Sequence, residues 1–140
     1  MEMSRVPLFG LIYKTGSILV NRTSDGSRRD SFAKMQETLD QGTNLCLYPE
    51  GTRNKTSQPM QSFFDGAFVI AIKSQKPVVP GLIFNTGEIL PGKEKFWMRP
   101  LPVRIHFLEP IPTKGMTLDD LPVFKARVRS LMEEYYTTNN

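Results

Sequence analysis

Segments with helical spacing alternate along this chain with short, continuous apolar runs, and this alternation restricts the possible fold. Helical spacing is clearest near the C-terminus, where apolar residues recur three and four positions apart between charged ones. Short runs such as residues 45–48 and 78–84 have the length and composition of buried strands. Strands and helices in alternation are typical of a mainly parallel sheet flanked by helices, so an α/β fold is predicted. The apolar positions of the C-terminal pattern are Leu121, Phe124, Val128, Leu131 and Tyr135.

The same patterns predict where each element begins and ends. Gly42 is the expected stop of one helix, and Pro77 ends another. Asp120 is a better N-cap for the last helix than Thr117, because Pro122 then falls in the first turn. No linker or repeat divides the chain, so residues 1–140 are predicted to form a single domain. In the first half of the chain we expect a helix at 7–14, a strand at 17–20, a polar turn at 23–27, a helix over 32–39, a strand at 45–48 and a loop at 49–59. In the second half we expect a helix at 66–74, a strand at 78–84, an irregular segment at 90–102 with Trp97, a half-buried strand at 103–107 and a final helix from 121.

Composition and charge are those of an ordinary folded protein and indicate anionic partners. Hydrophobic residues make up 39% of the 140 residues and charged residues 23%, and a chain of this length can bury a core. The net charge of +4 favours phosphorylated ligands, acidic carrier proteins or anionic lipid surfaces. No nucleic-acid partner is expected, because the longest arginine run is Arg28-Arg29. The lone Cys46 excludes an internal disulfide, and its apolar neighbours predict a buried, inert thiol.

The hydrophobic segments predict a protein that lies against a membrane without crossing it. A spanning helix needs about 20 apolar residues, whereas the longest apolar stretch, Val6–Val20, is interrupted by Lys14. No secretory signal is evident, so a cytoplasmic location is expected. Residues 6–14 and 96–99 combine apolar or aromatic side chains with a basic one, which is typical of peripheral contact with a bilayer. Packing in the core is the alternative for both segments.

The loop after residue 48 carries the chemistry of an anion site. Gly51 permits a positive φ or a close backbone approach, and Thr52 offers a hydroxyl. Arg53 adds a planar fork of donors that suits a phosphate. Glu50 can hold Arg53 or a neighbouring donor in place through a charge-assisted bond. An ordinary loop with a surface ion pair is the alternative interpretation of the same residues.

This loop and its flanking segment resemble a known motif. Leu47-Tyr48-Pro49-Glu50-Gly51-Thr52-Arg53 is similar to the acceptor-phosphate motif of the glycerolipid acyltransferase family, the 1-acylglycerol-3-phosphate acyltransferases. Upstream, residues 16–22 (GSILVNR) resemble the second motif of that family, a strand that ends in an arginine. Downstream, residues 76–80 (KPVVP) resemble its fourth motif. The motifs occur in the order and at the distances usual for the family, over about residues 4–132.

The resemblance implies a function and a set of site residues. The reaction would be acyl transfer from acyl-CoA or acyl-carrier protein to the hydroxyl of a lysophosphatidate-like acceptor in phospholipid synthesis. It would proceed at a membrane surface and without a metal or other cofactor. Arg53 and Arg22 would bind the acceptor phosphate, Gly51 and Thr52 would shape the pocket, and Glu50 would support it.

Two departures from the family pattern modify this expectation. The family places a catalytic His-x-x-x-x-Asp pair a few tens of residues before its second motif, which here would fall before Met1. The lone His106 is a poor substitute and is expected to be structural, so no catalytic residue is predicted in this chain. Residues 63–66 (FFDG) also replace the Phe-Lys-x-Gly found in many members, which removes positive charge near the phosphate site.

These departures leave three interpretations open. The chain can be the central and C-terminal part of an incomplete acyltransferase domain, inactive or weak alone. It can instead be a non-catalytic module that binds anionic lipid or phosphate, derived from the same family. The third interpretation is an α/β fragment without an independent function.

Overall fold

The computed structural model describes residues 25–54, 56, 58–89 and 99–140. The chain divides into two units, Met1–Cys46 and Leu47–Asn140, and each is described by itself. The elements expected at residues 7–14 and 17–20, Arg22 and Trp97 lie outside the described residues, and the single domain stays a prediction. Among the described residues, no helix is long and apolar enough to cross a membrane.

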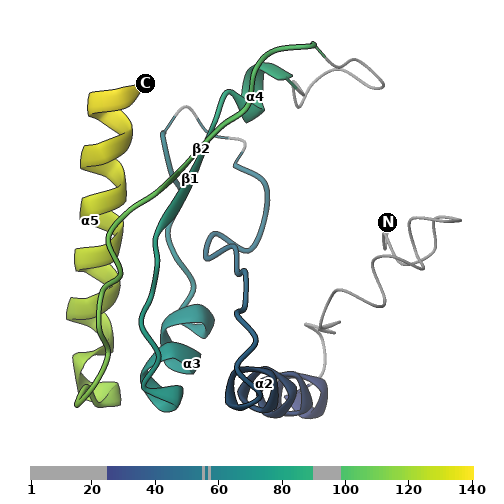
Figure 1. The fold of residues 1–140 in the computed structure, drawn as a ribbon, viewed down its shortest axis with the longest axis vertical. Helices are drawn as coiled ribbons and strands as arrows, with labels where there is room; N and C mark the ends of the chain where they lie inside the picture. Colours follow the sequence, from purple (N-terminus) through teal and green to yellow (C-terminus); the bar gives the residue numbers. More distant parts are fainter. Residues whose placement is uncertain (1–24, 55, 57, 90–98) are drawn as a thin grey trace, which may run out of the picture. The chain divides into compact units, whose positions relative to one another are not determined.

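The described part of the first unit is mainly the helix α2, Asp25–Asp40 (Figure 1). The predicted helix is confirmed, but it begins inside the polar turn expected at residues 23–27. Aspartate and serine are frequent near helix N-termini as well as in turns, so composition alone did not separate the two. At the other end Gly42 has φ of 81°, and the Thr43 N–H donates to the Thr38 carbonyl at 3.1 Å. This left-handed glycine cap confirms the predicted stop.

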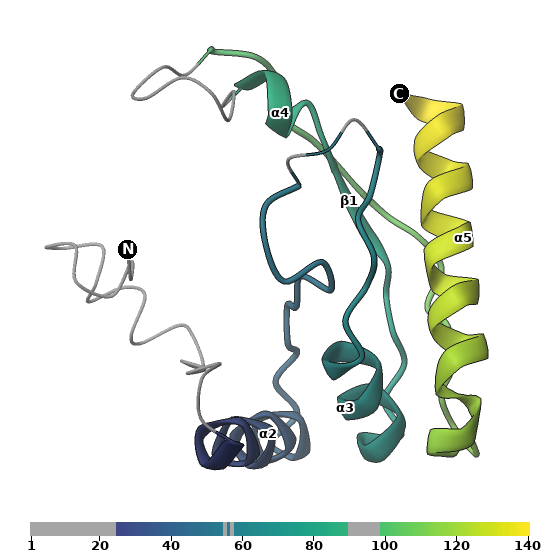
Figure 2. The same ribbon diagram turned by 180° about the vertical axis from the view of Figure 1, so that it is seen from behind.

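The second unit contains α3 (Gly66–Ser74), β1 (Gly81–Phe84), the short α4 (Thr86–Ile89), β2 (Arg104–Phe107), the 3-10 helix η2 (Leu118–Asp120) and α5 (Leu121–Asn139). Figures 1 and 2 show α5 running alongside the two strands, with α3 near its N-terminal end. The bounds of α3 agree with the sequence-based prediction. The buried core of this unit consists of Met60, Phe63, Phe68, Ile72, Leu82, Phe84, Ile111, Phe124 and Val128.

Aromatic side chains connect the two longer helices of this unit. Phe68 of α3 meets Phe124 of α5 edge-to-face, with ring centroids 5.8 Å apart. Phe63, which precedes α3, stacks on Phe68 with ring centroids 6.1 Å apart. All three rings are buried, and such pairs stabilise a core beyond their buried area. The chain just before α3 is thereby fixed to the core, which positions the loop that precedes it.

The strands form a two-stranded antiparallel sheet in which Leu82 pairs with His106 and Phe84 with Arg104. The prediction of a mainly parallel sheet is not met in the described part of the chain, where no parallel pair occurs. The strand expected at residues 78–84 is also shorter, because Pro80 has no N–H to donate to a ladder. Before Pro80, only an isolated antiparallel bridge remains, between Val78 and Ile111.

The half-buried strand expected at residues 103–107 has its faces reversed. The apolar Ile105 and Phe107 are 53% and 74% exposed, whereas His106 is half-buried beside Phe84. The register puts Ile105 opposite Ile83, which is also exposed, so the two apolar side chains share the outer face. Alternation predicted the strand correctly, but it does not determine which face meets the core.

Asp120 is the N-cap residue of α5, as predicted. Asp120 makes no side-chain cap bond to α5; its carboxylate instead accepts from the Thr117 N–H at 2.8 Å and the Thr117 hydroxyl at 3.2 Å. Thr117 is therefore the N-cap of η2, which leads directly into α5. Pro122 lies in the first turn of α5, as predicted. Of the expected apolar face, Phe124 and Val128 are buried, but Leu131 is 39% exposed.

The segment before the loop is the clearest error in the predicted elements. Residues 45–48 form no strand, and Leu47 and Tyr48 are exposed. Cys46 is also exposed, which contradicts the predicted buried thiol. An apolar run forms a strand only if a neighbouring strand supplies backbone hydrogen bonds. In the described part of the chain, no strand pairs with residues 45–48.

Candidate functional site

The Glu50-Gly51-Thr52-Arg53 segment begins in a tight turn. The Gly51 N–H donates to the Tyr48 carbonyl at 3.0 Å, and Gly51 has φ of 64°. This value confirms the positive φ expected at Gly51. A residue with a Cβ would be strained in this conformation, which explains why glycine occupies the position. The chain then continues into Thr52 and Arg53, and both of these residues are exposed.

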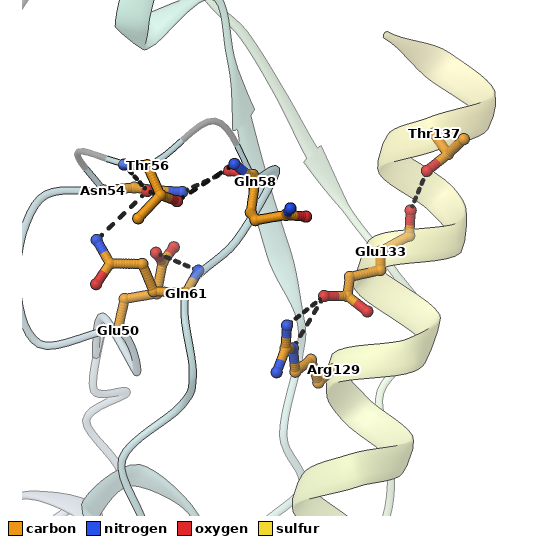
Figure 3. Close-up of polar contacts among 8 residues, drawn as sticks. All are labelled: Glu50, Asn54, Thr56, Gln58, Gln61, Arg129, Glu133 and Thr137. Carbon is orange, nitrogen blue, oxygen red and sulfur yellow. Dashed lines mark hydrogen bonds and ion pairs between the residues drawn. The ribbon is translucent and has the colours of Figure 1, made fainter.

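Two hydrogen bonds close residues 49–64 into a loop. The Gln61 N–H donates to Glu50 Oε2 at 2.9 Å, and the Phe64 N–H donates to the Pro49 carbonyl at 2.8 Å. Figure 3 shows the Glu50 carboxylate directed at the Gln61 backbone. Glu50 was expected to bind either Arg53 or a neighbouring donor, and the Gln61 N–H is such a donor. Glu50 therefore supports the loop through backbone that lies outside the motif.

Side-chain amides organise the interior of this loop (Figure 3). Asn54 Oδ1 accepts from the Thr56 N–H at 2.9 Å and the Thr56 hydroxyl at 2.7 Å, while Asn54 Nδ2 donates to the Gln58 carbonyl at 2.8 Å. Gln61 Nε2 donates to the Arg53 carbonyl at 3.2 Å and approaches Asn54 Oδ1 at 3.4 Å. The backbone around Arg53 is thus held by groups from both sides of the loop.

Exposed aromatic side chains flank the turn. Tyr48 is 72% exposed and Phe64 is 65% exposed, and the Phe64–Pro49 backbone bond brings their chain segments together. Phe64 stands where many members of the resembled family carry lysine. The neighbouring Asp65 pairs with Lys125 of α5 at 2.5 Å, so that ammonium is already partly neutralised.

The lone histidine has a structural environment. His106 Nδ1 lies 3.1 Å from the Tyr135 hydroxyl of α5, and its ring centroid lies 5.0 Å from that of Phe84. The side chain is half-buried and spans the contact between β2 and α5. These contacts agree with the structural role that the sequence predicted for His106.

The structure groups some predicted site residues and leaves one outside its described part. Glu50, Gly51, Thr52 and Arg53 lie in one closed loop, whereas Arg22 lies outside the described residues. The sequence did not indicate the roles of Gln61 and Asn54, whose side-chain amides bond to backbone and side-chain groups of the loop. The available signal was a loop rich in Asn, Thr and Gln, side chains that bond backbone groups in turns. Within the described ranges, no cluster of three His, Cys, Asp or Glu side chains could hold a metal ion.

Comparison with solved structures defines the class of fold. The crystal structure of a 1-acyl-sn-glycerophosphate acyltransferase, PlsC, from Thermotoga maritima matches with a TM-score of 0.66 at 24% identity. The match covers 79% of this chain and 45% of that chain. The chain therefore has an acyltransferase-like fold.

Sequence comparison identifies the family. The family model described as Acyltransferase matches residues 1–83, which is more than half of the chain. This range contains the closed loop with Glu50 and Arg53. The chain belongs to the acyltransferase family.

Curated relatives are similar over most of this chain. The human 1-acyl-sn-glycerol-3-phosphate acyltransferase alpha is 34% identical over 119 residues, which are 84% of this chain and 41% of the relative. The 1-acyl-sn-glycerol-3-phosphate acyltransferase of Saccharomyces cerevisiae is 30% identical over 134 residues, 94% of this chain and 44% of the relative. The chain thus spans less than half the length of these relatives.

Proposed function

We propose that this chain supplies the acceptor-binding part of an enzyme that transfers an acyl group to a lysophosphatidate-like glycerolipid in phospholipid synthesis. One observation carries the proposal: in a member of the acyltransferase family, an exposed Thr52-Arg53 pair follows a glycine turn that Glu50 ties to Gln61. The guanidinium of Arg53 is a planar donor that suits a phosphate monoester. Arg22 is proposed to contact the same phosphate.

The proposed chemistry is a direct acyl transfer. The acceptor hydroxyl attacks the thioester carbonyl of acyl-CoA or acyl-carrier protein, the carbon–sulfur bond breaks, and the thiol leaves. The hydroxyl proton passes through a general base to the departing sulfur. This reaction requires no metal, organic cofactor or acyl-enzyme intermediate. The resembled family assigns the base to its His-x-x-x-x-Asp pair, so the 140-residue chain by itself is expected to be inactive or weak.

The setting of the reaction belongs to the same proposal. A lipid acceptor resides in a bilayer, so we propose a cytoplasmic, peripheral position at the membrane. The exposed Tyr48 and Phe64 beside the turn have the aromatic character of interfacial residues. We also propose that the complete domain contains the mainly parallel sheet that the sequence predicted.

A binding measurement and an activity measurement together test the proposal. The chain is titrated with lysophosphatidate and, as a matched control, with a neutral monoacylglycerol that lacks the phosphate. Preference for lysophosphatidate that disappears in Arg53→Ala is the expected result. Equal binding of both lipids would contradict the proposal. Thioester release is then followed with acyl-CoA and with acyl-carrier protein, which determines the donor if turnover is observed.

A second function is favoured by one specific observation. The only histidine of the chain is held by Tyr135, which leaves no histidine of this sequence for base catalysis at the turn. A non-catalytic module that binds anionic lipid or phosphate would keep the loop and need no base. Vesicle binding that depends on Arg53, without thioester release under any donor, would favour this alternative.

A further inference from the structure

Gln61 lies outside the acyltransferase motif, yet both its backbone and its side chain bind residues of that motif. Its N–H donates to Glu50 Oε2 at 2.9 Å, and its Nε2 donates to the Arg53 carbonyl at 3.2 Å. We infer that Gln61 is a positioning residue of the anion-binding turn, which acts through the Arg53 backbone without touching the ligand. The inference rests on the proposed function, in which Arg53 binds the acceptor phosphate.

The geometry gives Gln61 two separate points of attachment. The bond to Glu50 fixes the backbone of Gln61, so its side chain starts from a defined position. From there the amide reaches the carbonyl of Arg53 and approaches Asn54 Oδ1 at 3.4 Å. The peptide group between Arg53 and Asn54 is therefore restrained from the opposite side of the loop (Figure 3).

Restraint of this peptide affects binding because Arg53 is exposed and its side chain is long. An arginine on a mobile backbone loses backbone and side-chain freedom together when it binds a phosphate. If the peptide is held beforehand, only the side-chain part of that cost remains. Removal of the Gln61 amide should therefore weaken phosphate binding while the fold and the guanidinium both persist.

The chemistry of the amide makes the inference specific. Gln61 Nε2 donates to two oxygen acceptors, so only a donor serves at this position. Glutamate has the same shape but no donor when ionised, and it would place a negative charge beside the Arg53 carbonyl. Gln61→Glu is therefore expected to weaken binding more than Gln61→Ala.

The same loop provides a matched control. Gln58 has the same side chain and is exposed, but within the described part of the loop it bonds only through its backbone N–H and carbonyl. In Figure 3 its side chain points away from Asn54 and Gln61. Gln58→Ala thus removes a glutamine amide from the loop without removing any of these bonds.

The test is a titration of the isotope-labelled 140-residue chain with sn-glycerol 3-phosphate, followed by NMR. Gln61→Ala should raise Kd by about threefold to tenfold, the scale of one net hydrogen bond, with Gln58→Ala within about twofold of the parent. In the Arg53→Ala background, Gln61→Ala should cause no further change, because it acts through Arg53. Unshifted amide signals from α5 and α3 confirm that each variant is folded.

Three results would overturn the inference. Parent affinity in both Gln61 variants would show that the amide does not position the site. A further loss of affinity from Gln61→Ala in the Arg53→Ala background would indicate direct ligand contact. An unchanged Kd in Arg53→Ala would contradict the proposed function itself. If Arg53→Ala weakens binding but the Gln61 variants keep the parent Kd, only the inference about Gln61 is contradicted.

Discussion

Gln61 lies eleven residues after Glu50, and its backbone N–H is bonded to the Glu50 carboxylate at 2.9 Å. The glutamate of the motif therefore closes the loop that carries Arg53. A carboxylate bond to a backbone N–H is stronger than a bond between neutral groups. This relationship gives the motif a structural logic: the glycine turns the chain, the glutamate fixes the loop, and the arginine is presented at the surface.

Removal of the Glu50 carboxylate should loosen this loop. Glu50→Ala leaves the part-buried Gln61 N–H without its acceptor, which should lower the local opening free energy by about 1–2 kcal/mol. Hydrogen exchange of the Gln61 amide measures this change directly. Glu50→Gln keeps an acceptor oxygen and should lose less protection. Equal exchange rates in the parent and the alanine variant would contradict the assigned role of Glu50.

Arg53 should determine the affinity for a phosphorylated acceptor. Arg53→Ala is expected to weaken binding of a short-chain lysophosphatidate by about 1.5–3 kcal/mol, the scale of a hydrogen bond to a charged group. Arg53→Lys keeps the charge but loses the planar fork, so its affinity should be intermediate. Equilibrium titration by calorimetry provides the measurement. If the lysine variant binds as tightly as the parent, charge alone explains the site and the fork geometry does not matter.

Local sequence signals predicted the helices better than the sheet. The bounds predicted for α3 match the observed ones, and Gly42 stops α2 as expected. Strand formation depends on partners elsewhere in the chain, which a single sequence does not show. The run at residues 45–48 is apolar but unpaired, and the strand at 78–84 is interrupted at Pro80. The face of a strand is equally non-local, as the exposed Ile105 demonstrates.

For the candidate site, the sequence predicted which residues form the loop but not how the loop is held. Gly51 has the expected positive φ, and Glu50 binds a neighbouring donor. The contribution of Gln61 depends on the two ends of the loop meeting in space, which no motif spacing indicated. Side-chain amides have few sequence preferences strong enough to reveal such a contact before the fold is known.

The contact between α3 and α5 should dominate the stability of the second unit. Phe124 is 2% exposed and packs edge-to-face on Phe68, so Phe124→Ala should lower the free energy of unfolding by about 3–5 kcal/mol. This is a large fraction of the total for a small domain. The neighbouring Val123 is 74% exposed, and Val123→Ala should change stability by less than about 0.5 kcal/mol. Urea unfolding of both variants tests the contrast; similar losses would argue against the described core.

The Asp65–Lys125 ion pair should contribute little to stability despite its short distance. The two side chains are 57% and 31% exposed, and such pairs are typically worth about 0–1 kcal/mol. A double-mutant cycle with Asp65→Asn and Lys125→Met should give a coupling energy in that range, decreasing as salt is added. A coupling energy well above this range, insensitive to salt, would contradict a solvent-exposed ion pair.

Phe64 offers a direct test of the charge that this chain lacks beside the turn. The resembled family often has lysine at this position, and Phe64 is 65% exposed, so Phe64→Lys should be accommodated without loss of the fold. The Phe64–Pro49 backbone bond places the new ammonium near the turn, where it should strengthen binding of sn-glycerol 3-phosphate by about 0.5–1 kcal/mol at low salt. Phe107→Lys is the matched control, since Phe107 is 74% exposed on β2 and the net charge changes equally. An equal gain from both substitutions would attribute the effect to net charge, whereas a gain confined to Phe64→Lys would locate the anion at the Glu50–Arg53 loop.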